Sequence, residues 1–300
     1  MVLCRRNNEE ELGIARCNLG AMTAKKRSSK TSSTVENKAL APASAKREFQ
    51  QRLSQWYRRY GRDLPWRRTT DPYAILVSEV MLQQPQVERV LEFYRRFLAR
   101  FPTVAVLAAA SVDDVLTAWQ GLGYYRRARN LHLAAQQIME HHHGVFPDTF
   151  EEVAALPGVG RYTAGAVLCF AFGKRAPILD TNVQRVLERL FVRRSATSPH
   201  AMQKRLWRLA EEVLPQGAEA WVINQAMMDL GATLCTARNP RCTQCCLQAI
   251  CHAAPAFTTQ LGLFPYSEAP ETDLPLVAEA DAPVYGGGTP PPDFTRRGDG

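Results

Sequence analysis

The 300-residue sequence lacks three features that would point to other classes of protein. It has no apolar run of the roughly 20 residues that a bilayer-spanning helix requires, so we expect no membrane association. Its N-terminus shows no signal-peptide pattern, because Glu9, Glu10 and Glu11 interrupt any early apolar segment. Long alternating apolar and polar runs, typical of strands, are also missing. We therefore expect an intracellular protein of a reducing compartment: cytoplasmic and nucleoid-associated in a bacterium, or nuclear or mitochondrial in a eukaryote.

Positive charge is in excess. The chain has 37 Lys and Arg residues against 29 Asp and Glu residues, a formal net charge of +8 at pH 7. Pairs of arginines occur at 58–59, 67–68, 95–96 and 126–127. Such a balance suits a polyanionic partner, since each neutralised phosphate releases counterions. The charge alone is equally compatible with a protein that is merely soluble.

Helical patterns dominate the middle of the chain. Residues 1–45, with a basic run at 25–30, and residues 253–300, rich in Pro and Gly, lack apolar periodicity, so we expect two disordered tails. Between them, Asp71 and Pro72 form an N-cap and a first helical position, and apolar residues follow at i, i+3, i+4 spacing. A second such stripe lies in 183–191. The first stripe comprises Tyr73, Leu76, Val77, Val80 and Met81, and the second comprises Val183, Val186, Leu187, Leu190 and Phe191. The sequence predicts an all-α fold.

Eight cysteines are present, and in a reducing compartment they indicate metal binding before disulfides. Four of them have the spacing C-x6-C-x2-C-x5-C and are Cys235, Cys242, Cys245 and Cys251. This spacing does not distinguish tetrahedral zinc from a [4Fe–4S] cluster. Cys246 is a fifth thiol that could compete as a ligand.

The stretch "LPGVG" at 156–160 stands directly before a helix-forming run. Gly158 and Gly160 can adopt positive φ and allow a DNA backbone to approach closely. The N–H groups of the turn and of the next helix would then face a phosphate, with Arg161 beside them. Taken alone, the turn is better explained as an ordinary corner between two helices.

A series of motifs gives the chain a family resemblance. In order they are "LPWR" (64–67), "DPYAILVSEVMLQQ" (71–84), "GLGYYRRARNL" (121–131), "LPGVGRYTAGAVL" (156–168), "ILDTNVQRVL" (178–187), "NQAMMDLGATLC" (224–235) and the four cysteines. Over about 46–252 the sequence resembles the adenine DNA glycosylase (MutY-type) family of the helix–hairpin–helix DNA glycosylase superfamily. The resemblance implies a six-helix domain at 70–174 that contains the helix–hairpin–helix. It also implies a cluster domain made of 46–69 and 175–252, and it selects a [4Fe–4S] cluster over zinc.

The resemblance also implies a substrate and a reaction. The expected substrate is double-stranded DNA in which adenine is mispaired with 8-oxoguanine or guanine, and the expected enzyme is a monomer. The adenosine must leave the stack before its N-glycosidic bond can be hydrolysed. As in glycoside hydrolysis, the reaction needs an acid for the leaving group and a negative charge for the sugar. We expect a hydrolase acting on N-glycosyl bonds.

Three residues match the family's catalytic positions. Glu79 matches the acid, and Asp180 matches a second carboxylate; the alternatives are a solvated helix glutamate and a helix N-cap. We expect enclosure to raise the pKa of Glu79 and the helix N-terminus to lower the pKa of Asp180. Tyr162 occupies the position of a lysine that forms a Schiff base in the related endonuclease III type. A tyrosine has no amine, so the resemblance implies base removal without lyase activity; a packing aromatic is the alternative.

Further residues match the family's DNA interface. Gln83 and Gln84 resemble residues that fill the duplex near the estranged base. Leu122 and Tyr124 resemble the wedge that unstacks the duplex, with a core role as the alternative for Leu122. The expected substrate-binding set also contains Trp66, Arg67, Asn182 and Gln225.

The C-terminal domain of the family and two alternative functions also bear on the prediction. Family members continue into a C-terminal domain that checks for 8-oxoguanine. After "LGLFP" at 261–265 the sequence is short and rich in Pro and Gly, so we expect this domain to be absent. Two other functions stay open: a thymine or uracil mismatch glycosylase of the same superfamily, and a DNA-binding module without catalysis.

Overall fold

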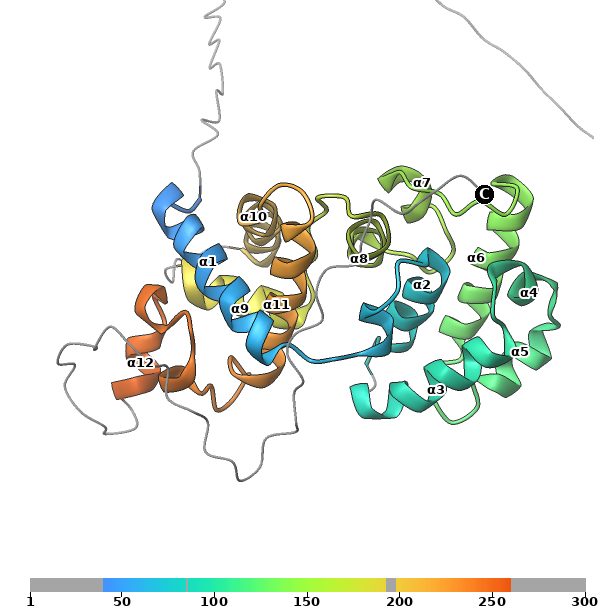
Figure 1. Cartoon of the computed structure of the whole chain (residues 1–300), viewed down its shortest axis with the longest axis horizontal. Coiled ribbons are helices and arrows are strands. Elements are labelled where there is room, and N and C mark those ends of the chain that lie inside the picture. The colour runs from blue at the N-terminus through green and yellow to red at the C-terminus, as the bar shows by residue number, and fades with distance from the viewer. Residues whose placement is uncertain (1–39, 85, 193–197, 260–300) are drawn as a thin grey trace, which may run out of the picture. The chain divides into compact units, whose positions relative to one another are not determined.

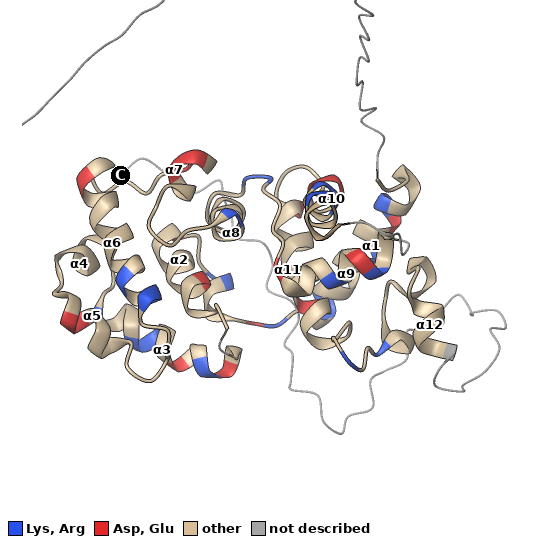
Figure 2. Ribbon diagram, turned by 180° about the vertical axis from the view of Figure 1, so that it is seen from behind, with Lys and Arg blue, Asp and Glu red and all other residues tan. Residues whose placement is uncertain are grey.

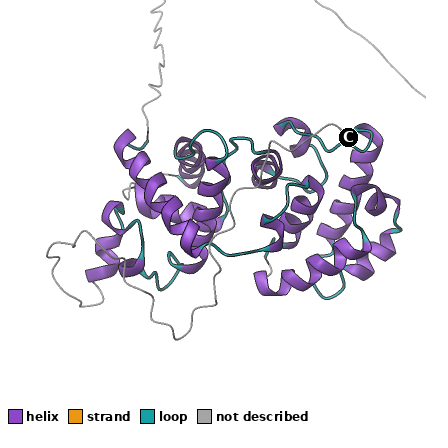
Figure 3. Ribbon diagram, viewed as in Figure 1, coloured by secondary structure: helices purple, strands orange, loops and turns teal. Residues whose placement is uncertain are grey.

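The computed structural model describes residues 40–84, 86–192 and 198–259, and its secondary structure in these ranges is entirely helical (Figure 3). The all-α prediction is confirmed. Most of the two predicted tails lies outside the described residues. In chain order the elements, with η for a 3-10 helix, are α1 (Ala43–Tyr60), η1 (Pro65–Arg67), α2 (Pro72–Met81), α3 (Val87–Arg100), α4 (Val104–Ala109), α5 (Val112–Ala118), α6 (Arg126–His141), α7 (Phe150–Ala154), α8 (Arg161–Phe172), α9 (Thr181–Phe191), α10 (Pro199–Glu212), α11 (Glu219–Thr233), η2 (Cys242–Gln244), η3 (Gln248–Ile250) and α12 (Ala254–Thr259).

Helical structure extends slightly beyond the predicted folded part. α1 begins before residue 46, and α12 lies entirely after residue 252. None of the helices in the described ranges is both long and apolar enough to span a bilayer.

Helix α2 begins as the sequence predicts. The Asp71 carboxylate accepts a 3.0 Å hydrogen bond from the Tyr73 amide, and Pro72 opens the helix. The helix is more buried than one apolar stripe predicts, because α8, α3 and α6 pack around it and every residue in 73–81 is buried. Glu79 is the only charged residue of α2; Figure 2 colours the acidic and basic positions of the described helices. The structure therefore places this carboxylate inside the protein, whereas a solvated helix glutamate was the alternative.

The N-terminal helix α1 packs against α11, which is far from it in the sequence (Figure 1). Helix α11 also packs against α9, and α9 packs against α10. The ring of Tyr57 meets Trp221 edge to face at 6.1 Å, and Phe49 meets Phe191 in the same way at 5.7 Å. These contacts join the beginning of the folded part to 181–233. The predicted domain boundaries at 69–70 and 174–175 stay a prediction.

Helices α2 to α8 contact one another in a second set. α4 and α5 pack on α6, α3 packs on α2 and α5, and α7 packs on α8. Phe97 and Trp119, both fully buried, meet edge to face at 5.7 Å. α2 also packs on α8, and a hydrogen bond joins Glu79, in the C-terminal part of α2, to Tyr162 in the first turn of α8.

The glycine turn between α7 and α8 follows the prediction at one glycine and departs from it at the other. Gly158 has φ +76°, and a Cβ there would lie 2.7 Å from the Asn130 Cβ. Both the backbone conformation and the close approach therefore require glycine. Gly160 has φ −98°, so the predicted positive φ is wrong for this residue. It is the N-cap of α8, a position that uses extended backbone.

A buried ion pair ties η1 to α11. The Asp229 carboxylate accepts hydrogen bonds from both Nη atoms of Arg67 at 2.7 and 2.8 Å, and from the Arg62 Nε at 2.7 Å. Asp229 is fully buried and Arg67 nearly so. Loss of one partner from a buried pair typically costs about 3–5 kcal/mol of stability, because the other charge is left uncompensated. The pair therefore fixes the segment before α2 against the far part of the chain.

Candidate active site

The three predicted catalytic residues come from three different helices. Glu79 lies on α2, Tyr162 lies in the first turn of α8, and Asp180 is the N-cap of α9. The Tyr162 hydroxyl forms a side-chain hydrogen bond with the Glu79 carboxyl group, and both residues interact electrostatically with Asp180. The structure thus brings the two carboxyl groups and the phenol together at one site.

Glu79 has the properties of an acid held ready at neutral pH. Only 3% of its surface is exposed. Burial raises the pKa of its carboxyl group to about 7, and the nearby Asp180 carboxylate acts in the same direction. The Tyr162 hydroxyl and the Arg67 guanidinium act in the opposite direction. The predicted rise is confirmed, and Glu79 keeps a proton at a pH where an ordinary glutamate is fully ionised.

Asp180 is held by several donors. Its carboxylate accepts a 2.7 Å bond from the Val183 amide and a 3.0 Å bond from Asn182 Nδ2. Burial nevertheless raises its pKa above 3.8, although these bonds and the Arg185 charge favour the ionised form. The predicted lowering is wrong, because the helix N-terminus compensates only part of the lost hydration. The pKa values of both carboxyl groups are therefore raised. The two groups differ in the hydrogen-bond donors around them and not in the direction of the pKa shift.

A chain of hydrogen bonds connects Asp180 with the first cysteine of the cluster motif. Asn182 Oδ1 accepts from Arg185 Nη2 at 2.7 Å; the same nitrogen donates to the Gly231 carbonyl, and Arg185 Nε donates to the Cys235 carbonyl, both at 2.7 Å. A Cβ at Gly231 would lie 2.6 Å from the Asn182 Cβ. Asn182, expected to bind substrate, thus orients Asp180 together with the Val183 amide.

Tyr162 is both a packing aromatic and a hydrogen-bond partner of Glu79. Its ring packs against the core, and its hydroxyl bonds to Glu79. Burial, followed by the two neighbouring carboxyl groups, raises the pKa of the phenol well above 10. The hydroxyl therefore stays protonated and can donate to the ionised form of Glu79.

Three further residues of the expected substrate-binding set are deeply buried. Trp66 is 6% exposed, Arg67 2% and Gln225 3%. The Trp66 ring meets Tyr94 edge to face at 5.3 Å. The Nη atoms of Arg67 bind Asp229 and the main chain, so its role here is to stabilise the protein and to bias Glu79 electrostatically.

Two loops carry the residues expected to enter the duplex. Gln84 is exposed and has φ +77°, and Tyr124 is 62% exposed with φ +50°. Leu122 is only 5% exposed and belongs to the core. The structure favours the core role for Leu122 and leaves Tyr124 as the side chain that reaches solvent. Gln83 is half-buried, and its carbonyl accepts a 2.8 Å bond from Arg127.

The predicted phosphate site lies at the start of α8. No side chain caps this helix, so the N–H groups of its first turn are open to an acceptor from outside. A Cβ at Gly160 would meet no atom within 4 Å, which leaves the backbone accessible. Arg161 is exposed, and its guanidinium lies 3.9 Å from the centre of the Trp207 ring.

Sequence reasoning missed three residues that organise the site: Arg127, Asn130 and Arg185. Each lies on a helix close to a residue that was identified. Arg185 is three positions after Asn182, a spacing that places two side chains on the same face of a helix. Such neighbours could have been identified by asking which long polar side chains lie one turn from a motif residue.

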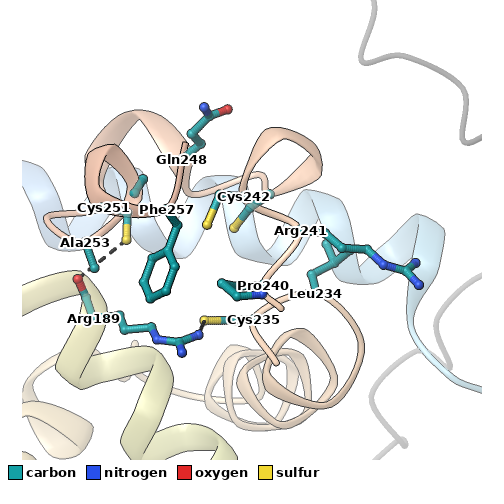
Figure 4. Close-up of a pocket in the computed structure, with 12 residues that line it drawn as sticks. Arg189, Leu234, Cys235, Pro240, Arg241, Cys242, Gln248, Cys251, Ala253 and Phe257 are labelled. Carbon is teal, nitrogen blue, oxygen red and sulfur yellow. Dashed lines mark hydrogen bonds between the residues drawn. The ribbon is translucent and has the colours of Figure 1, made fainter. Parts of the chain in front are cut away.

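The four predicted metal ligands line one cavity (Figure 4). Arg189 and Phe257 also line it; Arg189 Nη1 donates to Cys235 Sγ at 3.3 Å, and the guanidinium lies 4.8 Å from the Phe257 ring centre. Cys246 is not among the lining residues. It is 9% exposed and packs in the core, and its thiol bonds to Cys245.

The cavity fits a thiolate-bound metal group. Its lining has four thiols and two arginines, and contains no imidazole or carboxyl group, a donor set that suits zinc or an iron–sulfur cluster. Within the described ranges, no three His, Cys, Asp or Glu side chains converge as one metal ion would require. The four thiols are placed as donors around one space, and the same donors serve either group.

Comparisons with known proteins agree with this arrangement. Residues 77–212 match the HhH-GPD superfamily of base excision DNA repair proteins. The chain is 48% identical over 195 residues to adenine DNA glycosylase of Mycobacterium tuberculosis, covering 64% of each protein. It is 40% identical over 206 residues to adenine DNA glycosylase of Buchnera aphidicola subsp. Acyrthosiphon pisum, covering 68% of this chain and 59% of that protein.

The fold also matches a solved structure, that of a thermostable thymine-DNA glycosylase. The TM-score is 0.65 at 29% identity, over 71% of this chain and 98% of the other. The chain spans less than two thirds of the length of the adenine DNA glycosylases named above. Its motifs, its helical fold and these similarities show that the chain contains a domain of the HhH-GPD superfamily of base excision DNA repair proteins, at residues 77–212.

Proposed function

We propose that the protein is a monofunctional adenine DNA glycosylase, which hydrolyses the N-glycosidic bond of adenine mispaired with 8-oxoguanine or guanine in duplex DNA. The observation that carries this proposal is the buried Glu79 carboxyl group in contact with Tyr162 and near Asp180. The similarity to two adenine DNA glycosylases at 40% and 48% identity supports adenine as the base.

Glu79 supplies the proton that the leaving base needs. With a pKa raised to about 7, it holds a proton at neutral pH and passes it to N7 of the flipped adenine. Adenine then leaves as a neutral base. A positioned acid of this kind typically contributes about 10²–10⁴-fold to the rate.

Asp180 stabilises the positive charge that develops on the sugar. Its bonds to the Val183 amide and the Asn182 side chain keep its orientation fixed, and a preorganised charge needs no rearrangement during the reaction. Tyr162 holds Glu79 in place by the hydrogen bond between them. Because a tyrosine has no amine, no Schiff base forms at this position.

The helix–hairpin–helix and the two exposed loops bind the DNA. The open N-terminus of α8, next to Gly158 and Gly160, accepts a phosphate group. The exposed side chains of Tyr124 and Gln84 enter the duplex beside the mispair, which lowers the cost of extruding the adenosine. We infer a monomer that works in a reducing intracellular compartment.

Cys235, Cys242, Cys245 and Cys251 would hold a [4Fe–4S] cluster in the cavity that they line. When bound, the cluster would supply four covalent cross-links within one segment of 17 residues. The Arg189 guanidinium, bonded to Cys235 Sγ, offsets the negative charge of the thiolates. Cys235 and Cys251, both hydrogen-bonded to Arg189, also fix the loop of 235–251 against α9.

Product analysis under single-turnover conditions tests the proposal. Duplexes containing A opposite 8-oxoguanine, A opposite G, and T opposite G are each incubated with excess protein, and the free base is identified. We expect free adenine from the first two duplexes and no base from the third. Release of thymine from the third would favour the activity named for the thymine-DNA glycosylase of similar fold. Binding without release of any base would indicate a non-catalytic module.

A further inference from the structure

Arg127, at the start of α6, links the two loops that carry Gln84 and Tyr124. Its Nη1 donates to the carbonyls of Val80, Met81 and Gln83 at 2.6, 3.0 and 2.8 Å, and its Nη2 donates to the Gly123 carbonyl at 3.2 Å. Its guanidinium also lies 5.5 Å from the centres of the Trp119 and Tyr124 rings. One side chain therefore contacts the end of α2, the following loop and the loop of 121–125.

Both loops have backbone conformations that need support. Gln84 and Tyr124 have backbone φ values of +77° and +50°, a conformation that residues other than glycine rarely adopt. Gly121 and Gly123 have φ +95° and +82°. Such conformations persist only where the surrounding structure holds them. Arg127 bonds to the carbonyls of Gln83 and Gly123, the residues directly before Gln84 and Tyr124. Bonds at these positions can hold the backbone of both residues in place.

We propose that Arg127 is a positioning residue that holds the 82–84 loop and the 121–124 loop in one arrangement, so that Gln84 and Tyr124 enter the duplex together. The inference rests on the proposed function, since that function requires both side chains to act on the same mispair. A guanidinium suits this task because its planar fork carries several donors in fixed directions, whereas a lysine ammonium is a compact charge on a flexible stem.

The substitution Arg127→Lys tests the proposal, with Arg129→Lys as the matched control. Both changes keep the charge and lie on α6, but Arg129 is exposed. Single-turnover adenine release is measured on two duplexes, one with A opposite 8-oxoguanine and one with A opposite a tetrahydrofuran abasic-site analogue. In the second duplex the adenine has no partner, so its extrusion costs less and depends less on the loops.

We expect Arg127→Lys to slow release from the first duplex by about 10- to 100-fold, the size of effect that a misplacement near 1 Å produces. The loss on the second duplex should be several-fold smaller, and Arg129→Lys should leave both rates unchanged. Wild-type rates on both duplexes would overturn the proposal. Equal losses on both would also overturn it, because they would indicate a general structural role.

A double-variant cycle separates positioning from folding. If Arg127 acts partly through Tyr124 and partly through Gln84, the combined variant Arg127→Lys, Tyr124→Ala should lose less activity than the product of the two single losses. Losses that multiply would show that the two residues act independently and would contradict the proposal. The cycle compares the loss of rate caused by Arg127→Lys in the presence and in the absence of the Tyr124 ring. A lower melting temperature alone would slow release equally in both backgrounds.

A failure of the proposed function gives a different pattern. In that case wild-type protein releases no adenine from either duplex. The role of Arg127 is then read from the fluorescence of 2-aminopurine placed at the adenine position, which rises when the base is unstacked. We expect a smaller rise with Arg127→Lys than with the wild type or Arg129→Lys, and an equal rise in all three would overturn the inference.

Discussion

Glu79 shows how a single residue acquires its chemistry from burial. Its spacing in "SEVMLQQ" places it beside the apolar stripe, where a solvated glutamate is the ordinary interpretation. The packing of α8, α3 and α6 on α2 encloses it instead, and the loss of hydration raises its pKa to about 7. Neighbours from distant helices cause this enclosure, so local periodicity could not predict it. The family resemblance identified the residue, and the structure supplies the physical reason.

The raised pKa predicts a pH-dependent stability difference between the wild type and Glu79→Gln. Between pH 4.5 and about 7, folded protein holds a proton on Glu79 that the unfolded chain has released. Wild-type stability therefore falls as pH rises through this range. Glutamine has no charge to bury, so the stability advantage of Glu79→Gln should grow by about 3 kcal/mol from pH 4.5 to pH 8.

Denaturant unfolding at several pH values measures this difference. Glu140→Gln, at an exposed position on α6, is the control and should leave the pH dependence as in the wild type. An advantage of Glu79→Gln that stays constant from pH 4.5 to pH 8 would mean that the carboxyl group is already ionised within the folded protein.

At the scale of elements, the helices follow the sequence patterns closely and the turn between α7 and α8 follows them in part. Caps and apolar periodicity predict the start of α2 and the buried face of α9, because these signals are local. The different roles of Gly158 and Gly160 could not be predicted, since the first depends on the approach of Asn130 from α6. In the same way, the burial of Leu122 depends on contacts outside its own motif.

The two glycines of this turn should respond differently to alanine. Gly158→Ala would place a Cβ 2.7 Å from the Asn130 Cβ in a backbone with φ +76°, so we expect a loss of about 2–3 kcal/mol of stability. Gly160→Ala meets open space and ordinary backbone angles, so stability should change by about 1 kcal/mol or less. Its Cβ would instead obstruct a phosphate, so DNA binding should weaken.

Melting curves and DNA-binding titrations at fixed salt separate these effects. Equal destabilisation by both variants would contradict the different roles of the two glycines. Wild-type DNA affinity of Gly160→Ala would place the phosphate contact elsewhere.

At the scale of the whole molecule, contacts between segments far apart in the sequence connect the proposed catalytic groups to the rest of the chain. The Arg67–Asp229 pair joins the segment before α2 to α11, and the hydrogen bonds through Asn182 and Arg185 join Asp180 to Cys235. Spacing in the sequence predicted the cysteine set, because its members lie close together along the chain. The contacts could not be predicted, since each partner appears in the sequence as an ordinary polar residue.

The cysteine assignment predicts different outcomes for adjacent residues. Cys242→Ser removes a thiol that lines the cavity, whereas Cys246→Ser changes a buried thiol outside the lining. For protein purified without oxygen, we expect Cys242→Ser to lose iron, sulfide and the broad absorbance near 400 nm that the proposed cluster would give. Cys246→Ser should keep all three. Equal iron loss in both variants would mean that Cys246 belongs to the ligand set, and zinc in place of iron in the wild type would contradict the cluster.

The pH dependence of adenine release tests the central claim, that buried Glu79 is the acid for the leaving base, most directly. Single-turnover release from a duplex with A opposite 8-oxoguanine is measured from pH 6 to pH 9 for the wild type and for Glu79→Gln. Since Glu79 loses its proton as pH rises through about 7, the wild-type rate should fall above that pH by up to about tenfold per unit. Glu79→Gln should bind the duplex and release adenine about 10²–10⁴-fold more slowly at pH 7, without this fall. Release by Glu79→Gln at the wild-type rate, or a wild-type rate that is constant over the whole range, would contradict the claim.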